Sequence, residues 1–239
     1  MRELKIMTFN IHHGVGTDGR LDLDRIATVI IESNADIIGL NEVDRSFSQR
    51  SDYMDEIKYL AEKLKFEYSF SPSLTLKCRF SKNGGKYGNA LLSKFPLVAK
   101  KPHQMDFISG IIEGRSLLQA TIEPTYSLPI HFFVTHLSIN PFLQRKQIEF
   151  ILKHTTALKN TPVLVMGDFN LRSGQKNWRR LNSKLNDLGS GQPTYPSKRP
   201  RVQLDYLFGN NHVKAKNIQV FDYLPEASDH LPLLATIKF

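Results

Sequence analysis

The chain has 239 residues, of which 41% are hydrophobic and 23% are charged, a balance that excludes a disordered or fibrous protein. Lysine and arginine outnumber aspartate and glutamate by 32 to 23, so the formal net charge is +9. Such a charge favours polyanionic partners such as nucleic acid or an acidic membrane surface, although a basic protein with no particular partner has the same balance.

Cysteine usage and hydropathy bear on the cellular setting. The single cysteine, Cys78, cannot form an internal disulfide and stands near no metal or nucleophile motif. The first residues run into a predicted strand without an apolar signal region, and no apolar stretch approaches the roughly 18 residues of a membrane helix. We expect a cytoplasmic protein with no stable membrane insertion, and we expect it to be a monomer.

Apolar side chains in the first half of the chain recur with the period of a strand or of a helix. Ser51 is the expected cap of the second helix, and the Gly- and Lys-rich residues 81–88 are expected to form a mobile loop. The elements predicted here are strands at 4–9, 36–40, 68–76 and 90–93 and helices at 22–34 and 51–65.

The second half repeats this mixture of strands and helices. Residues 115–122 and 130–135 are expected to pair antiparallel, and a proline opens the helix that follows them. Without a repeat or a long linker, the order predicts a single α/β (α+β) domain over 1–239, with helices packed outside sheets. The elements predicted here are strands at 115–122, 130–135, 162–166, 202–208, 213–221 and 231–239 and helices at 141–159 and 177–185.

Polar side chains recur where the predicted strands end. Each one alone has a structural alternative: the asparagines suit turns, Asp205 suits an ion pair, and a lone histidine such as His136 suits the core or the surface. Their recurrence at consecutive strand ends favours one shared site. The residues concerned are Asn10, Glu42, Asn89, Arg115, His136, Asp168, Asn170, Asp205, Asp229 and His230.

This set of side chains fits hydrolysis of a phosphoester. Carboxylates such as Glu42 and Asp229 suit Mg²⁺, Mn²⁺ or Ca²⁺ better than Zn²⁺. A metal ion can neutralise phosphoryl oxygens, a carboxylate or histidine can take a proton from water, and amide and cationic groups can hold the developing charge. Two basic clusters, 176–184 and 198–201, are candidate phosphate-contacting surfaces.

Eight motifs carry a family resemblance, in family order and over nearly the whole chain. The chain resembles the endonuclease/exonuclease/phosphatase superfamily, which includes nucleases similar to deoxyribonuclease I and exonuclease III, sphingomyelinases and inositol polyphosphate phosphatases. The motifs are TFNIHHG (8–14), LNEVDR (40–45), GNALLS (88–93), GR (114–115), THL (135–137), GDFN (167–170), LDY (204–206) and SDH (228–230).

The resemblance implies a fold, a reaction and a metal site. The implied fold is a four-layered α/β sandwich of two face-to-face mixed sheets flanked by helices, similar to deoxyribonuclease I. The implied reaction is Mg²⁺-dependent attack of water on phosphorus without a covalent enzyme intermediate, and Mn²⁺ or Ca²⁺ are possible substitutes. Glu42 is implied to be the principal metal ligand, with Asn10 and Asp229 close to the metal.

The resemblance also implies roles in handling water and phosphate. Asp168 and His230 would orient and activate water, and Asp205 would hold the imidazole of His230. Asn170 would hydrogen-bond the phosphoryl oxygens, and His136 would contact the phosphate as a possible general acid. The remaining implied phosphate-binding residues are Arg115, Asn89 and His12.

The sequence departs from patterns within the superfamily in two respects. Asn41 stands where many members have glutamine before the metal-binding glutamate. His12 stands where the abasic-site nucleases have an acidic residue, and Val202 and Gln203 replace their aromatic pocket wall. Abasic-site repair is therefore not expected.

The leading functional hypothesis is a phosphodiesterase that acts on nucleic acid or another polyanionic phosphodiester. The alternatives are hydrolysis of a phospholipid headgroup, an inositol phosphate or a small phosphoester, and a non-catalytic nucleic-acid-binding module. Substrate selectivity is expected to depend on the segments 79–88, 103–114 and 177–200.

Overall fold

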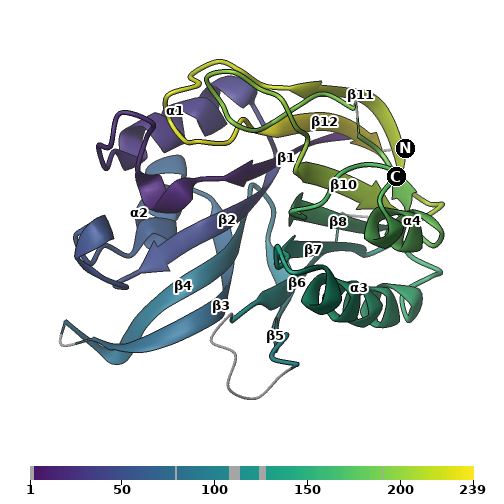
Figure 1. Ribbon diagram of the computed structural model, residues 1–239, viewed down its shortest axis with the longest axis horizontal. Helices are drawn as coiled ribbons and strands as arrows, with labels where there is room; N and C mark the ends of the chain where they lie inside the picture. The colour runs from purple at the N-terminus through teal and green to yellow at the C-terminus, as the bar shows by residue number, and fades with distance from the viewer. Residues whose placement is uncertain (1–2, 79, 108–113, 124–127, 190) are drawn as a thin grey trace.

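The computed structural model describes residues 3–78, 80–107, 114–123, 128–189 and 191–239. The parts of the proposed selectivity segments at 79, 108–113 and 190 lie outside these residues. Two six-stranded sheets lie face to face (Figure 1). The first runs in the order β11 (Lys214–Val220), β12 (Leu233–Lys238), β1 (Glu3–Asn10), β2 (Ile37–Arg45), β4 (Ser81–Ser93) and β3 (Glu67–Cys78). The second runs in the order β5 (Leu97–Gln104), β6 (Ser116–Ile122), β7 (Ile130–His136), β8 (Val163–Asp168), β10 (Asp205–Gly209) and β9 (Asn186–Asp187).

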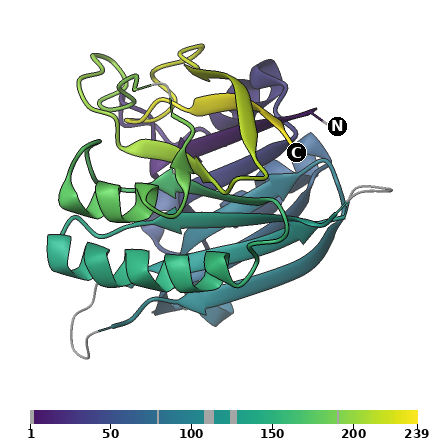
Figure 2. The same cartoon turned by 90° about the vertical axis from the view of Figure 1, so that its right-hand side faces the viewer.

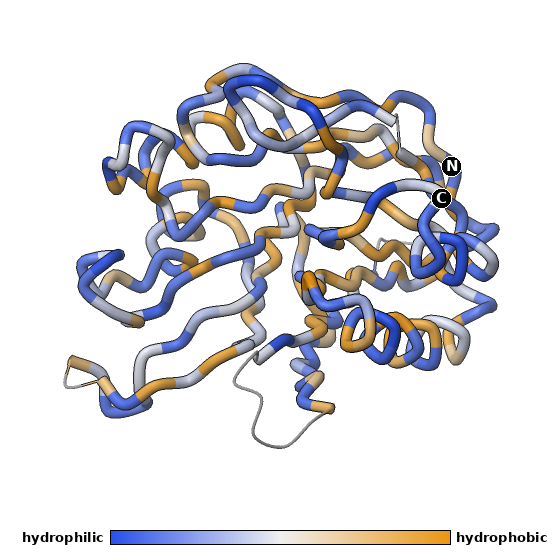
Figure 3. The backbone as a smooth tube through the Cα atoms, viewed as in Figure 1, coloured by the Kyte–Doolittle hydropathy of each residue, from blue (hydrophilic) through white to orange (hydrophobic). Residues whose placement is uncertain are grey.

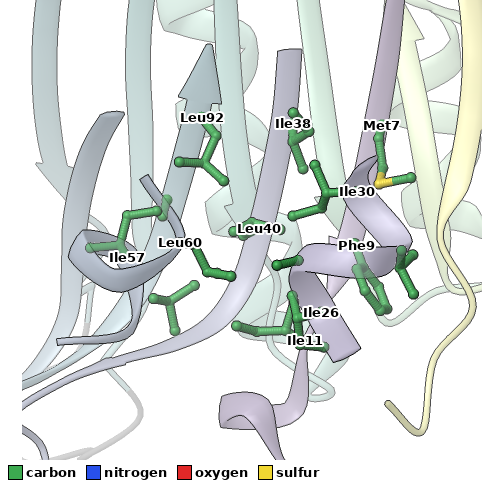
Figure 4. Close-up of a cluster of buried hydrophobic side chains, with 14 of the residues drawn as sticks. Met7, Phe9, Ile11, Ile26, Ile30, Ile38, Leu40, Ile57, Leu60 and Leu92 are labelled. Atoms are coloured by element: carbon green, nitrogen blue, oxygen red, sulfur yellow. The ribbon is translucent and has the colours of Figure 1, made fainter. Parts of the chain in front are cut away.

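Helices cover the outer face of each sheet. In the first half of the chain α1 (Leu23–Ser33) and α2 (Glu56–Leu64) pack on the first sheet, and Figure 4 shows their side chains meeting those of β1, β2 and β4. In the second half α3 (Pro141–Thr156) and α4 (Lys176–Asn182) lie side by side on the second sheet (Figure 2). The predicted four-layered α/β sandwich is confirmed.

Local signals explain where the longer helices begin and end. The Asp22 carboxylate caps α1 by accepting hydrogen bonds from the amides of Asp24 and Arg25. Asn34 ends α1 in the left-handed conformation, with φ of 51°. Asn140 caps the N-terminus of α3 with its side chain, as Asp22 does for α1, and a proline occupies the first turn of α3.

The interior between the two sheets is filled by alternate residues of each strand. Leu4 and Ile6 of β1 point inward, as do Leu164 and Met166 of β8, while Met7 packs under α1. Hydrophobic residues are interspersed with hydrophilic ones along the tube in Figure 3. Because side chains alternate between faces, the last inward position of a strand also faces the opposite sheet.

Both sheets are mixed. β1 pairs parallel with β2 in the first sheet, and β7 pairs parallel with β8 in the second. The connections between these partners contain α1 and α3, as a parallel crossover requires. The carboxyl ends of both parallel pairs therefore bring their last inward side chains to one edge of the sandwich.

Three predictions about elements were wrong. The expected loop at 81–88 is part of β4, which pairs with β3 along its length and with β2 from Lys86 to Ser93. A Cβ at Gly88 would lie 2.1 Å from the Ser71 carbonyl oxygen, so glycine here permits close strand pairing. Ser51 does not cap α2, because Asp55 does, and the Ser51 hydroxyl instead donates to Asp44.

The third error concerns β2, which was expected to stop at residue 40 and continues to Arg45. β5 and the short β9 were not predicted, because β5 is an exposed edge strand rich in lysine and β9 has two residues. No helix in the described part of the chain is long and apolar enough to span a membrane.

Candidate active site

The candidate site lies at the edge where the two parallel strand pairs end. Asn10 is opposite Asn41 across β1 and β2, and His136 is opposite Asp168 across β7 and β8. Asp205, the first residue of β10, pairs with Asp168 from the other side. The strand alternation that buries the apolar core therefore directs all of these polar side chains between the sheets.

Asn10 connects carboxylates of the two sheets. Its Nδ2 donates to Glu42 Oε1 at 3.0 Å and to Asp168 Oδ2 at 3.2 Å. Its Oδ1 accepts from the His12 amide at 3.1 Å. A buried amide with all these partners keeps the two carboxylates in one small region.

Glu42 reaches the site from an irregular part of β2. The pairing of β2 with β4 shifts register between Leu40 and Val43, and the backbone of Glu42 is left-handed with φ of 59°. A bulge of this kind re-aims a side chain, and a left-handed non-glycine residue costs about 1–3 kcal/mol. The surrounding sheet holds Glu42 in this conformation, with its side chain partly exposed.

His230 and Asp205 form a buried pair beside Asp168. His230 Nδ1 lies 2.8 Å from Asp205 Oδ2, which also accepts from the Thr194 hydroxyl at 2.6 Å. Burial lowers the pKa of His230, but the Asp205 charge and hydrogen bond, with Asp168 and Asp229, raise it overall to about 10. His230 Nε2 lies 3.7 Å from Asp168 Oδ2, and burial raises the pKa of Asp168 to about 7.

His136 and Asn170 complete the cluster around Asp168. His136 Nε2 lies 3.5 Å from Asp168 Oδ2 and 3.0 Å from Asn170 Nδ2, and its Nδ1 lies 4.0 Å from Glu42 Oε1. Burial, followed by the charges of Arg115 and His230, holds the pKa of His136 well below its usual range. These surroundings favour the neutral form of the His136 imidazole over the charged form.

The backbone of the GDFN motif fits only a glycine at its first position. Gly167 has φ of 142°, and a Cβ there would lie 1.8 Å from the Thr135 carbonyl oxygen. Asn170 is left-handed with φ of 48°, and its amide donates to Asp168 Oδ1 at 2.9 Å. The close approach of β8 to β7 thus sets the positions of Asp168 and Asn170.

Asn41 links the two sheets behind the cluster. Its Nδ2 donates to Asn89 Oδ1 at 2.8 Å and to the Thr135 carbonyl at 2.9 Å, while its Oδ1 accepts from the Asp168 amide at 2.8 Å. Asn89 is 1% exposed, and its Nδ2 donates to Ser116. The structure therefore places Asn89 in an interior network and not against the open side of the site.

The other predicted residues stand at the margin. His12 contacts Asn10 through its backbone, and its Nδ1 bonds the Val15 carbonyl at 3.0 Å. Asp229 is half-buried beside His230 and contributes to the raised pKa of that residue. Arg115 is half-buried and influences the pKa of His136 through its charge.

Two contributors were missed by the sequence reasoning. Thr194 holds Asp205 through its hydroxyl, and the Tyr195 ring lies 4.8 Å from the His230 ring between centroids. Both residues lie in the irregular segment between β9 and β10, where neither periodicity nor a motif singled them out. Their role depends on a fold that brings this segment over β10.

Metal binding stays a prediction. Among the described residues, no three or more His, Cys, Asp or Glu side chains are grouped closely enough to hold a metal ion. The predicted ligands are two carboxylates, Glu42 and Asp229, and the amide of Asn10. Their oxygen chemistry fits a hard divalent cation, although Asn10 presents its nitrogen to Glu42 in this structure.

Two grooves lie beside the cluster. The α3/α4 groove, of about 520 Å³, is lined by Asn170 and by residues of both helices, among them Phe142, Arg145, Lys176 and Arg180. The Tyr195 groove, of about 530 Å³, is lined by Arg172, Tyr195, Arg201 and their neighbours. The two basic clusters predicted from the sequence therefore each contribute to a groove near the site.

Comparisons with known proteins agree with this architecture. The model of the Endonuclease/Exonuclease/phosphatase family matches residues 7–230. No curated protein matches the chain in sequence. An endonuclease/exonuclease/phosphatase from Beutenbergia cavernae has a similar structure, with a TM-score of 0.83 and 24% identity, over 100% of this chain and 72% of that one.

Two further solved structures are also similar to this chain. A mannosyl-6-phosphatase from Bacteroides thetaiotaomicron matches with a TM-score of 0.78 and 16% identity, over 99% of this chain and 100% of that one. The catalytic domain of human Nocturnin, solved with a bound sulfate anion, matches with a TM-score of 0.75 and 20% identity, over 99% and 94%. At such identities these likenesses concern the fold.

Proposed function

Because this chain belongs to the endonuclease/exonuclease/phosphatase family, whose members hydrolyse phosphoester bonds, we propose that it is a divalent-metal-dependent phosphodiesterase acting on nucleic acid. The observation that carries the proposal is the convergence of Glu42, His136, Asp168 and His230 around the amides of Asn10 and Asn170. Carboxylates, imidazoles and amides grouped in this way suit attack of water on phosphorus.

Glu42, Asn10 and Asp229 are the residues that would hold the metal ion. Their donor atoms are the kind that Mg²⁺ prefers, and Glu42 is the partly exposed carboxylate of the cluster. When bound, the ion would neutralise charge on the phosphoryl and leaving oxygens. Mn²⁺ and Ca²⁺ share this preference for oxygen and are the expected substitutes.

The remaining residues handle water and phosphate. Asp168 would accept a proton from the attacking water, and its position between two imidazoles and the Asn10 amide supports this role. His230, oriented by Asp205, stabilises the charge that forms beside it. Asn170 and His136 would hydrogen-bond the phosphoryl oxygens, with Arg115 supplying positive charge.

The basic grooves favour nucleic acid as the substrate. The net charge of +9 attracts polyanions in general, and the cations Arg145, Lys176 and Arg180 line a groove that Asn170 also lines. A substrate with several phosphates would contact the groove and the cluster together. A compact phosphoester would occupy the cluster alone.

Glu42→Gln tests the chemistry. This change keeps the size of the side chain and removes its charge, so it should weaken metal binding and lower kcat/KM for bis(p-nitrophenyl) phosphate by roughly 10²–10³-fold. The measurements are hydrolysis with Mg²⁺ or Mn²⁺ and Mn²⁺ binding by calorimetry. Glu62→Gln, an exposed carboxylate on α2, is the matched control.

Two results would contradict the proposal. Hydrolysis and Mn²⁺ affinity that are unaffected by Glu42→Gln would remove Glu42 from the site. Activity of the wild-type protein in excess chelator would remove the metal ion from the reaction.

The second candidate is a small-molecule phosphatase or phosphodiesterase. The full-length structural match to a mannosyl-6-phosphatase favours it, because that protein has the same extent and fold. A substrate panel of single-stranded DNA, RNA, sugar phosphates, inositol phosphates and phospholipids separates the two candidates. Preference for a monophosphate sugar over every polynucleotide would establish the second candidate.

A further inference from the structure

The α3/α4 groove is continuous with the candidate active site. Asn170 belongs to both, because its side chain contacts His136 and it also lines the groove. The groove then runs between the start of α3 and α4, lined by Ile139, Phe142 and cationic residues. A substrate seated at His136 and Asn170 can extend directly into it.

Buried hydrogen bonds make the floor of this groove a built surface. Gln144 is 4% exposed, and its Nε2 donates to the carbonyls of Phe169 and Asn170, which binds α3 to the GDFN motif. Asn177 Nδ2 in turn donates to Gln144 Oε1 at 2.8 Å and to the Pro141 carbonyl at 2.9 Å. The two helices and the motif are therefore held in a fixed relation.

An exposed apolar platform lies on the α3 side of the groove. Phe142 is 52% exposed and Ile139 is 75% exposed, although both belong to residue types that folded proteins usually bury. The Arg145 guanidinium lies 5.7 Å and the Lys146 ammonium 5.1 Å from the Phe142 ring centroid. This ring is therefore about half exposed and has positive charge beside it.

The groove carries a net positive charge. Arg145, Lys176 and Arg180 line it, and one exposed carboxylate, Glu149, lies 3.7 Å from Arg145 and 3.9 Å from Arg180. A single carboxylate offsets only part of three cations. The remaining charge suits the phosphates of a polyanion.

We infer that the α3/α4 groove is a subsite for single-stranded nucleic acid, in which an unpaired base stacks on Phe142 and flanking phosphates contact Arg145, Lys176 and Arg180. This inference rests on the proposed function, because it places the groove next to the phosphate that is cleaved. It adds that the groove is the part of the protein that distinguishes single-stranded from double-stranded nucleic acid.

The shape and chemistry of the groove favour a single strand over a duplex. Bases that are not paired expose their faces for stacking on aromatic side chains, and this contact tolerates any sequence. In a duplex the bases are stacked on each other, so that Phe142 has no free base to contact. Phosphate contacts alone would not distinguish the two forms.

The first experiment measures binding without turnover. Anisotropy of a fluorescein-labelled oligothymidylate is followed in the presence of chelator, against the same strand in a duplex. We expect Phe142→Ala to raise the Kd for the single strand about tenfold and Phe142→Tyr to retain affinity. Lys176→Glu should raise the Kd, because it removes a phosphate contact. For the same reason it should lower the slope of log Kd against the logarithm of the salt concentration by about one or more.

Matched controls come from other surfaces of the protein. Tyr223 is also 52% exposed, and Lys214 is an exposed lysine on β11. Tyr223→Ala and Lys214→Glu should leave the affinity for the oligothymidylate unchanged. Circular dichroism and thermal unfolding establish that each variant is folded.

A second measurement relates the groove to catalysis. The ratio of kcat/KM for the oligonucleotide to kcat/KM for bis(p-nitrophenyl) phosphate should fall about tenfold in Phe142→Ala, because the small substrate offers no base to stack. The inference is overturned if Phe142→Ala binds the single strand like the wild type, or if the duplex binds equally tightly. Failure of the proposed function is a different result, namely no hydrolysis of either substrate by the wild type.

Discussion

Asp205 and His230 show how burial and charge oppose each other at single residues of the site. Asp205 is fully buried, and one of its oxygens, Oδ1, has no hydrogen-bond partner among the described residues. The other oxygen accepts from Thr194 and bonds His230. The cost of burying a charged pair such as this is offset only where good geometry and further hydrogen bonds accompany it.

Asp205→Asn should lower the pKa of His230 toward its ordinary value of 6.5 from about 10. The amide keeps the shape of the side chain and removes the negative charge, so the imidazolium loses its main partner. We expect a kcat lower by roughly 10²-fold for bis(p-nitrophenyl) phosphate. An NMR titration of the His230 ring measures the pKa, and an unchanged value would contradict the assignment.

The same change should affect stability in a defined pH window. A histidine whose folded pKa is raised contributes stability that is fully present below pH 6.5 and is lost as the pH rises from 6.5 to about 10. The free energy of unfolding in urea should therefore differ most between Asp205→Asn and the wild type below pH 6.5, at pH values where both are folded. The difference should be smallest above pH 10.

Among the elements, α2 is joined to β2 by a buried carboxylate in its first turn. Glu56 Oε2 accepts from the Asp44 amide at 2.7 Å, whereas Oε1 is buried and has no partner in the described structure. Burial, with the nearby Asp44 charge, raises the pKa of Glu56 well above its ordinary value. The stability of the contact between α2 and β2 thus depends on whether Glu56 is protonated.

Glu56→Gln should remove this dependence. A carboxyl with a raised folded pKa contributes stability that is present below about pH 4.5 and is lost as the pH rises through the folded pKa. The neutral amide still accepts from Asp44, so we expect a gain of about 1 kcal/mol at pH 8 and little change at pH 4. Urea unfolding at both pH values measures it, and a loss at pH 8 would contradict it.

Elements with strong local sequence signals were predicted, and an element with misleading local signals was not. α1 and α3 were predicted because caps and periodic apolar residues agree, and β8 because Pro162 and Gly167 bound an apolar run. β4 was misread because its glycines, which permit close pairing with β3, have the composition of a loop. Pairing across the sheet decided its structure, and a single sequence does not show pairing.

Several of the residues that the motifs singled out lie together in the structure, and their roles stay predictions. Asp168 ends β8 and His230 lies in a short turn, and Glu42 reaches them from the bulge within β2. The interior position of Asn89 and the contact of Thr194 with Asp205 were not predicted. Both depend on contacts between distant segments, which leave no periodic or local pattern.

For the whole molecule, Asn41 is one of the polar links between the two sheets. It accepts from the Asp168 amide and donates to Asn89 and to the Thr135 carbonyl, so that it bonds three strands in two sheets. Elsewhere an apolar cluster fills the space between the sheets. Asn41 therefore contributes to the alignment of the two halves of the site.

Asn41→Ala should both destabilise the protein and misalign the site. It leaves three buried groups without their present partner, and each such group costs about 1–3 kcal/mol. We expect a loss of about 3 kcal/mol in urea unfolding and a lower kcat with bis(p-nitrophenyl) phosphate. Asn217→Ala on the exposed edge strand β11 is the control, and a stable variant with full activity would contradict the role of Asn41.

The order of strands in the first sheet has a consequence for synthesis of the protein. β1 pairs with β2 on one side and with β12 on the other, from Glu3 opposite Lys238 to Thr8 opposite Leu233. β1 is synthesised before β12, and Asp229 and His230 immediately precede β12. A nascent chain that has not yet reached β12 therefore has an open sheet edge at β1 and a candidate site without Asp229 and His230, so the sheet and the site are completed together.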